Sequence, residues 1–359
     1  MNIPGFAVHF GAGALGRGLV VPRLAAAGWA VALVDPDRAL VAALTEAGGY
    51  PLAVTDGTHR AVSDVPVAAA LAPGDPALAE LAAAARLVTT AVRRENLGRV
   101  AAALVSAWNA GGMPETVAVV GCENVERVDE VLAAAFEEAG ITPAQRARLV
   151  LPRTVVDRIC AADWPSGLLV TTEPFNELAA AEPAALPGID AVADIDARFA
   201  RKRYLVNTFA DASAVLGAAR GHRTLAEAVS DAGIARQIAP LLAALRLHLE
   251  LAHGFAGDAL EAYLDQSRRR LANAAIPRRL ETVSRDFGRK LGPTERFAEP
   301  LIDLESRGRL DDRAVAVIAA LVRAAVPAPA MRAALADAGA CPDPAASRFY
   351  ARLRTALAA

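Results

Sequence analysis

Lysine is rare in this sequence, and its two lysines are therefore the first candidates for chemistry. Of the 38 basic residues only Lys202 and Lys290 are lysines, although an arginine would supply positive charge equally well. The pKa of a lysine falls readily on burial, so its amine can give and take a proton where a guanidinium stays charged. This scarcity favours proton transfer as a role for lysine. The alternative is that two lysine codons survived a compositional bias by chance.

A glycine-rich motif lies near the N-terminus. Gly11, Gly13 and Gly16 form the pattern G-x-G-x-x-G directly after the apolar run of residues 6–10. The first glycine allows a tight turn, the second lets a pyrophosphate approach the backbone, and the third allows close packing of a helix whose N-terminal amides attract the anion. The motif predicts a dinucleotide site. The loop residues expected to contact the dinucleotide are Gly11, Ala12, Gly13, Ala14, Leu15 and Gly16.

Asp35 and Thr90 extend the predicted dinucleotide site. Asp35 follows a second apolar run, 24 positions after Gly11, where its carboxylate can accept hydrogen bonds from the adenosine ribose diol. A 2′-phosphate would be repelled there, so the sequence favours NAD over NADP, although the nearby Arg38 weakens this preference. Thr90 ends another apolar run and is expected near the nicotinamide half, but threonine is also a common strand residue.

Composition excludes several functional classes. The chain has 359 residues, of which 54% are hydrophobic, and a net charge of −2, so neither disorder nor binding to nucleic acid or to an anionic membrane is expected. Apolar runs stay shorter than the roughly 18 residues of a membrane span, and the N-terminus lacks a signal-peptide pattern. The three cysteines have no metal-ligand spacing, and no metal is expected. These features predict a cytoplasmic protein with a small-molecule substrate.

The pattern of apolar residues predicts the elements that position these groups. Strand-like runs alternate with helical stretches up to about residue 190, and long helical periodicity follows. We therefore expect an α/β protein, with a Rossmann-type dinucleotide-binding domain at 1–190 and an all-α substrate domain at 191–359. Strands are expected at residues 6–10, 29–34, 87–90, 117–121 and 168–172. Helices are expected at 15–27, 38–47, 125–139, 202–219, 225–252, 258–274 and 311–325, with a capping helix and loops after 326.

A family resemblance becomes visible when several short stretches are taken together, in their order and spacing. They are His9-Phe10-Gly11-Ala12-Gly13, Gly16-Arg17-Gly18, Thr89-Thr90-Ala91-Val92, Cys122-Glu123-Asn124, Val156-Asp157-Arg158-Ile159, Arg201-Lys202, Val206-Asn207-Thr208, Gly221-His222, Arg285 and Arg289-Lys290-Leu291. With these stretches the chain resembles the polyol-specific long-chain dehydrogenase/reductase family, the mannitol dehydrogenase family, and within it most closely the mannitol-1-phosphate 5-dehydrogenase group.

The resemblance implies a reaction and roles for particular residues. Lys202 would be the general acid or base, and Asn207 and Asn124 would hydrogen-bond the reacting oxygen while hydride passes to or from NAD. The implied reaction interconverts a secondary alcohol of a polyol, sugar acid or sugar phosphate and its ketone. Lys290 and Arg285 would hold a phosphate or distal hydroxyls of the substrate, unless they belong to a solvated helix face. The implied site lies in the cleft between the domains of a monomer or small homo-oligomer.

The sequence departs from the family pattern directly after Asn207. The family has Asn-Thr-Gly-His where this chain has Asn207-Thr208-Phe209-Ala210, so the histidine is absent. On a regular α-helix Phe209 would lie nearly above Lys202, with Ala210 between Lys202 and Asn207. We therefore expect Phe209 to exclude water from the lysine and Ala210 to leave room for a substrate group or a water. The substrate would then differ from mannitol 1-phosphate.

Two other functions are compatible with the same residues. An enzyme that keeps NAD tightly bound could use transient oxidation for epimerisation or elimination. A dinucleotide-binding sensor could have lost catalysis together with the histidine. Release of NADH during turnover distinguishes the first alternative, and NADH binding without activity on any polyol or ketose would favour the second.

Overall fold

The computed structural model describes residues 5–182, 186–325 and 342–358. The chain forms two compact units, residues 1–196 and 197–359, and each is described by itself. The predicted order, a parallel Rossmann-like sheet followed by a helical region, is confirmed. None of the helices in the described ranges has the length and hydropathy needed to cross a membrane.

A six-stranded parallel sheet forms the centre of the first unit, in the order β5-β2-β1-β6-β7-β8. Its strands are β1 (Phe6–Phe10), β2 (Ala30–Val34), β5 (Ala69–Leu71), β6 (Ala85–Thr90), β7 (Val117–Gly121) and β8 (Leu149–Val150). Its helical segments are η1 (Gly16–Val20), α1 (Val21–Ala26), α2 (Arg38–Ala47), α3 (Ala77–Ala84), η2 (Arg94–Asn96), α4 (Leu97–Gly111), α5 (Val128–Glu138) and α6 (Pro143–Arg146).

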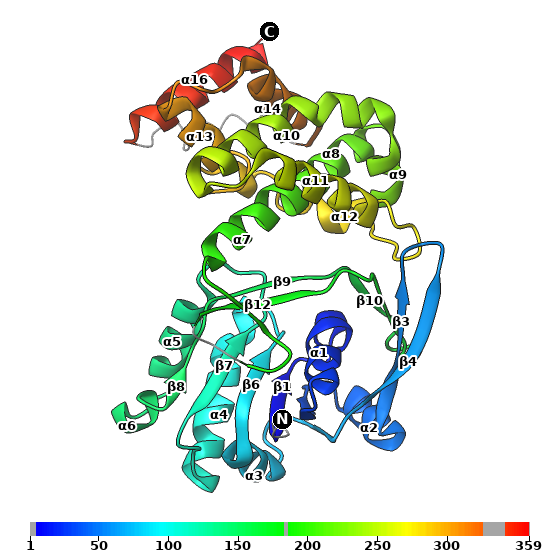
Figure 1. The fold of residues 1–359 in the computed structure, drawn as a ribbon, viewed down its shortest axis with the longest axis vertical. Helices are drawn as coiled ribbons and strands as arrows, with labels where there is room; N and C mark the ends of the chain where they lie inside the picture. The colour runs from blue at the N-terminus through cyan, green and yellow to red at the C-terminus, as the bar shows by residue number, and fades with distance from the viewer. Residues whose placement is uncertain (1–4, 183–185, 326–341, 359) are drawn as a thin grey trace. The chain divides into compact units, whose positions relative to one another are not determined.

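Both faces of this sheet are covered. Ala7 packs in one buried cluster with residues of η1 and α1, and the next residue, Val8, packs in another with residues of α3, α4 and α5. Figure 1 shows α1 and α4 on opposite sides of the strands. Because alternate side chains of a strand enter different cores, the strands are apolar throughout, as their sequences indicated.

Two smaller sheets in the first unit were not expected from the sequence. One has the order β10-β11-β3-β4 and the other the order β13-β12-β9, and both contain antiparallel pairs. Their strands are β3 (Gly49–Thr55), β4 (Arg60–Pro66), β9 (Thr154–Asp157), β10 (Cys160–Ala162), β11 (Val170–Thr172), β12 (Glu177–Ala181) and β13 (Asp190–Val192). Only β11 falls within an expected strand.

The second unit is helical in its described part. Its segments are α7 (Ile195–Lys202, which starts in the first unit), η3 (Arg203–Thr208), α8 (Phe209–Ala219), α9 (Leu225–Ser230), α10 (Ala232–His253), α11 (Gly257–Leu271), α12 (Leu280–Val283), η4 (Arg289–Leu291), α13 (Glu299–Ser306), α14 (Asp312–Ala325) and α16 (Pro344–Ala358). The expected single helix over 225–252 is wrong, because Asp231 ends α9 and caps α10 by accepting hydrogen bonds from the amides of Gly233 and Ile234. Residues 326–341 of the expected tail lie outside the described residues.

Candidate functional site

The glycine-rich loop begins where β1 ends. Gly11 has φ +102°, and a Cβ there would lie 2.5 Å from the carbonyl oxygen of Ala91. A Cβ at Gly16 would lie 2.1 Å from the oxygen of Gly11, whereas a Cβ at Gly13 would meet no atom within 4 Å. Packing inside the protein therefore requires glycine at 11 and 16. The open space beside Gly13 is what a dinucleotide pyrophosphate needs, so the loop fits such a group.

The helix after this loop starts as a π-helix. The expected regular α-helix is wrong over Gly16–Val20, where the segment η1 ends with a hydrogen bond from the amide of Val21 to the oxygen of Gly16, five residues earlier. The amide of Arg17 donates to the oxygen of Gly13 at 3.0 Å, so the turn stays joined to the loop. π-Turns of this kind are frequently found at functional sites.

Arg17 supports the loop from within the first unit. Its side chain is 1% exposed, donating from Nε to the oxygen of Ala12 at 2.7 Å and from Nη1 to the oxygen of Leu168 at 2.8 Å. Its guanidinium lies 5.5 Å from the ring centre of Tyr50, whose hydroxyl donates to the oxygen of Arg17. The sequence had not marked Arg17 as a site residue, and the only available signal was its place between Gly16 and Gly18.

His9 is a neutral side chain beneath the same loop. Its Nε2 lies 3.0 Å from the oxygen of Gly11 and its Nδ1 lies 2.7 Å from the hydroxyl of Thr89. A carbonyl only accepts, so Nε2 carries the proton and Nδ1 accepts from Thr89. Complete burial lowers the pKa of His9 from 6.5 to about 4. His9 therefore positions the loop without adding charge to it.

Asp35 is held at the end of β2 by backbone donors. Its Oδ2 accepts from the amide of Ala12 at 2.7 Å, and its Oδ1 accepts from the amide of Asp37 at 2.9 Å. The side chain is only partly buried, and each oxygen keeps a further lone pair. Asp35 thus presents a fixed acceptor beside the glycine-rich loop, as a ribose diol requires. Arg38 is exposed in the first turn of α2.

Thr90 is the last residue of β6, and Asn124 follows the neighbouring strand β7 at the same edge of the sheet. Thr90 pairs with Gly121, so the segment carrying Asn124 begins beside it. The hydroxyl of Thr90 donates to Oε2 of Glu123 at 2.8 Å, and the amide of Val92 donates to Oε1 at 2.9 Å. Burial raises the pKa of Glu123, and these donors oppose that rise. Thr90 therefore anchors Glu123 in the strand end that leads to the exposed Asn124.

Lys202 directly precedes a second π-helical segment, and Asn207 lies within that segment. Lys202 ends α7 and is 7% exposed, and the residues from Arg203 to Thr208 form the π-helix η3. The hydroxyl of Thr208 donates to the oxygen of Arg203, five residues earlier, at 3.0 Å. The expected regular α-helix is therefore wrong here, and so are the angles derived from it. Because a π-helix has more residues per turn than an α-helix, Asn207 lies closer to Lys202 around the helix axis than a regular α-helix would place it.

The residues after this π-turn are buried. Phe209 is 2% exposed and Ala210 is 3% exposed at the start of α8. The guanidinium of Arg268 lies 5.9 Å from the ring centre of Phe209. Both positions are thus closed to bulk water within the second unit, and the effect of Phe209 on the lysine remains a prediction.

The carboxylate of Asp211 forms ion pairs with two basic side chains. Its Oδ1 lies 3.0 Å from Nζ of Lys290 and its Oδ2 lies 3.2 Å from a guanidinium nitrogen of Arg296. Lys290 also donates to the oxygen of Val283 at 3.2 Å and is 7% exposed. Burial raises the pKa of Asp211, and Arg296 and Lys290 oppose that rise. Both carboxylate oxygens of Asp211 are therefore paired within this cluster. Lys290 uses its ammonium group to bind Asp211 and the oxygen of Val283. Arg285, in contrast, is exposed.

Comparison with known proteins shows to which family this chain belongs. The family model described as the mannitol dehydrogenase Rossmann domain matches residues 6–189, and the model of the mannitol dehydrogenase C-terminal domain matches residues 194–328. The chain belongs to the mannitol dehydrogenase family. The resemblance inferred from the sequence is confirmed, and with it the class of oxidoreductase.

Relatives and solved structures agree with this membership of the mannitol dehydrogenase family. The mannitol-1-phosphate 5-dehydrogenase of Pseudarthrobacter chlorophenolicus is 32% identical over 351 residues, covering 92% of this chain and 88% of that protein. The enzyme of the same name from Enterococcus faecalis is 30% identical, covering 87% of this chain and 84% of that protein. The fold matches Pseudomonas fluorescens mannitol 2-dehydrogenase with a TM-score of 0.75 at 18% identity, covering 99% of this chain and 92% of that one.

For this member of the mannitol dehydrogenase family, the structure brings together some predicted residues and not others. The glycine-rich loop and Asp35 meet through a direct hydrogen bond, and Lys202 is the N-cap residue of the π-helix that contains Asn207. Lys290 and Arg285 differ in their surroundings, since Lys290 is buried against Asp211 and Arg285 is exposed, and their shared role stays a prediction. No group of three or more histidine, cysteine or acidic side chains placed to hold a metal occurs in the ranges that the structure describes.

Proposed function

We propose that this chain is an NAD-dependent dehydrogenase that interconverts a secondary alcohol of a polyol or sugar phosphate and its ketone. The observation that carries the proposal is the π-helix at Arg203–Thr208, which begins directly after the buried Lys202 and contains Asn207. The printed name of the relatives, mannitol-1-phosphate 5-dehydrogenase, supports a phosphorylated polyol as the substrate class.

The first unit has residues that fit NAD. The amides of the loop from Gly11 to Gly16 would hold the pyrophosphate at the open side of Gly13, and Asp35 would accept from the adenosine ribose. Thr90 lies at the strand edge expected near the nicotinamide. When bound, this cofactor supplies the hydride acceptor and donor.

Lys202 moves the proton in this proposal. In the oxidative direction its neutral amine takes the proton of the substrate hydroxyl, and in the reductive direction the ammonium returns it. Asn207 and Asn124 donate amide N–H groups to the same oxygen, where negative charge develops. The burial of Lys202 limits competition from water.

The missing histidine leaves a specific gap in the family arrangement. Ala210 has no hydrogen-bonding side chain, and Asp211 is already engaged by Lys290 and Arg296. Orientation of the substrate oxygen therefore depends on the asparagines and Lys202. Compared with the glycine and histidine of the family pattern, Phe209 and Ala210 change the side-chain volume beside the π-turn. This change favours a substrate other than mannitol 1-phosphate. Arg285, with any remaining capacity of Lys290, would hold the distal hydroxyls or the phosphate.

Nicotinamide absorbance with a panel of polyols, polyol phosphates and their keto forms tests the proposal. Lys202→Ala should lower kcat by about 10²–10⁴-fold, the usual contribution of a general acid or base, without changing the dissociation constant of NADH. Lys202→Arg should be equally inactive, because a guanidinium stays protonated. Activity that survives in Lys202→Ala, or that Lys202→Arg restores, would refute the role of the amine.

A second pair of substitutions tests the altered pocket. The double variant Phe209→Gly with Ala210→His restores the family pattern, and we expect it to raise kcat/KM for mannitol 1-phosphate. The matched control is Phe209→Gly alone, which changes volume without adding an imidazole. Equal activity of the double variant and the wild type on mannitol 1-phosphate would contradict the proposed change of substrate.

A further inference from the structure

The second unit contains a basic pocket that shares no residue with the candidate site described above. Its volume is about 390 Å³, and its walls are one face of α10 and the segment that leads into α14. The face of α10 supplies alanines, Pro240 and Leu247, and the charged rim consists of Arg236, Arg309, Asp311 and Arg313. Pockets of this volume hold small molecules.

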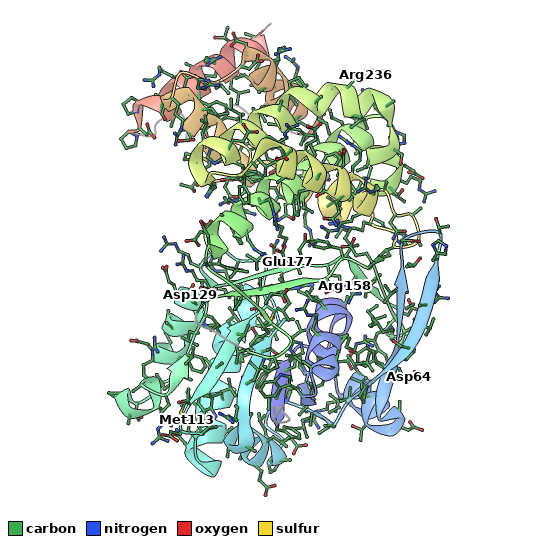
Figure 2. The ribbon with its side chains drawn as sticks, in the orientation of Figure 1. Asp64, Met113, Asp129, Arg158, Glu177 and Arg236 are labelled. Atoms are coloured by element: carbon green, nitrogen blue, oxygen red, sulfur yellow. The ribbon has the colours of Figure 1, made fainter. Side chains whose placement is uncertain are left out.

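The charges of the rim are not balanced within the described structure. Asp311 is paired with Arg313, with a shortest distance of 2.7 Å between Nη2 and Oδ2. In the part of the chain that the structure describes, the guanidinium groups of Arg236 and Arg309 have no hydrogen bond or ion pair. Three guanidinium groups and one carboxylate give the lining a net charge of +2. Figure 2 labels Arg236 on the helical unit.

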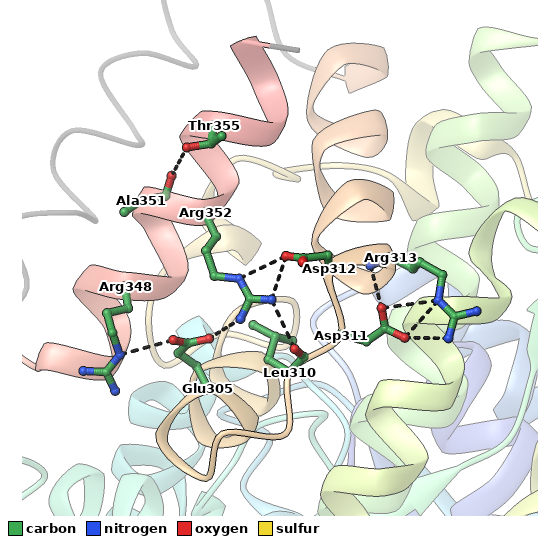
Figure 3. Close-up of polar contacts among 9 residues, drawn as sticks. All are labelled: Glu305, Leu310, Asp311, Asp312, Arg313, Arg348, Ala351, Arg352 and Thr355. Carbon is green, nitrogen blue, oxygen red and sulfur yellow. Dashed lines mark hydrogen bonds and ion pairs between the residues drawn. The ribbon is translucent and has the colours of Figure 1, made fainter.

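The rim is held in place by a polar network, drawn in Figure 3. Arg352 of α16 donates to Oδ1 of Asp312 at 2.7 Å and to the oxygen of Leu310 at 3.1 Å, and it also pairs with Glu305. Asp311 accepts from the amide of Arg313 at 2.8 Å. These bonds fix the backbone on both sides of Asp311, so the wall of the pocket is ordered before a ligand arrives.

We propose that this pocket is a binding site for a small phosphate monoester. A phosphate monoester carries about −1.5 to −2 charges at pH 7, which matches the net charge of the lining. Guanidinium groups bind phosphate oxygens in forked pairs, and Arg236 and Arg309 are available to do so. The alanine, proline and leucine surface of α10 accommodates the carbon part of the ester. A monocarboxylate has half the charge and fits the lining less well.

Calorimetric titration of the full chain with phenyl phosphate, in 150 mM salt and saturating NADH, tests the proposal. NADH fills any phosphate-binding surface of the dinucleotide loop. We expect saturable binding with a dissociation constant below about 1 mM, and at least about tenfold weaker binding of benzoate. Arg236→Gln and Arg309→Gln should each weaken phenyl phosphate binding about tenfold, because each removes charge-assisted hydrogen bonds.

Three further variants make the result specific. Arg323→Gln removes the same charge from the far end of α14, outside the pocket, and should bind as the wild type does. Ala243→Phe places a bulky ring on the pocket lining without changing charge and should abolish binding, with an unchanged melting temperature as evidence of folding. Lys202→Ala should bind normally, which separates the pocket from the catalytic lysine. Binding that is absent, equal for benzoate, or unaffected by Arg236→Gln and Arg309→Gln would overturn the proposal.

Discussion

Substitution by alanine should affect different properties at two glycines of one loop, cofactor binding at Gly13 and folding stability at Gly16. Alanine at position 13 meets no protein atom within 4 Å, whereas alanine at position 16 would place its Cβ 2.1 Å from the oxygen of Gly11 and 2.4 Å from Nε2 of His9. Both atoms at position 16 belong to buried, hydrogen-bonded groups that have little room to move. Gly13→Ala is therefore a binding variant, and Gly16→Ala is a folding variant.

The expected magnitudes follow from these contacts. For Gly13→Ala we expect the free energy of unfolding to stay within about 0.5 kcal/mol of the wild type, as for other substitutions without steric conflict. Its methyl group would keep the pyrophosphate from the loop amides, and the loss of one or two charge-assisted hydrogen bonds, about 2–3 kcal/mol, corresponds to roughly 30–150-fold weaker NADH binding. For Gly16→Ala the overpacking should cost about 1–3 kcal/mol of stability or more.

Urea denaturation and NADH fluorescence titration, carried out on both variants, measure the two effects. Gly98→Ala, in α4 and also without an atom within 4 Å of the new Cβ, is the control for an unobstructed alanine outside the loop. If Gly13→Ala binds NADH as tightly as the wild type, the dinucleotide does not approach this face of the loop. If Gly16→Ala is as stable as the wild type, the tight packing described for the loop is wrong.

Three further predictions concern buried groups. Because the pKa of His9 is about 4 in the folded chain and 6.5 when unfolded, the unfolded state binds the proton first as pH falls, so stability is lost from about pH 6.5 down to pH 4. His9 should account for about 2 kcal/mol of the loss between pH 7 and pH 5 in urea denaturation, and the same pH dependence in His9→Asn would contradict this. Asp211→Asn leaves Lys290 and Arg296 without their carboxylate and should lower the free energy of unfolding by about 3–5 kcal/mol. The control Asp265→Asn, at the exposed pair with Arg268, should lower it by less than about 1 kcal/mol. Equal losses of stability in the two variants would refute a buried cluster. Arg17→Met should lower the melting temperature and weaken NADH binding together, since Arg17 joins Ala12 of the loop to Leu168, and a loss of stability with unchanged NADH affinity would show that the loop does not depend on it.

Much of the first unit could be predicted from the sequence because its central sheet is buried on both faces. Such strands are unbroken apolar runs, and the expected strands at 6–10 and 117–121 coincide with β1 and β7. The hairpin of β3 and β4 was missed because β4 is exposed over most of its length and its sequence lacks that signal. Such a strand is defined by its partner, through pairs such as Leu52 with Ser63.

The candidate site was predictable in its residue types and not in its geometry. Lys202 and Asn207 stand out in the sequence, but a helix drawn with α-helical angles would separate them. The π-turn after Lys202 cannot be recognised from residue types, because η3 is held by packing against α8, α10 and α11.

The sequence by itself determined the glycine-rich loop, the acidic residue after the second strand, the scarce lysines and the family, because each is written in contiguous residues or in fixed spacings along the chain. Only the tertiary structure decided that Lys290 is paired with Asp211, 79 positions away, and that Arg17 and His9 are buried beneath the loop. The physical reason is that the charge state and hydrogen bonds of a buried group depend on its neighbours in space, which folding brings together from distant parts of the chain.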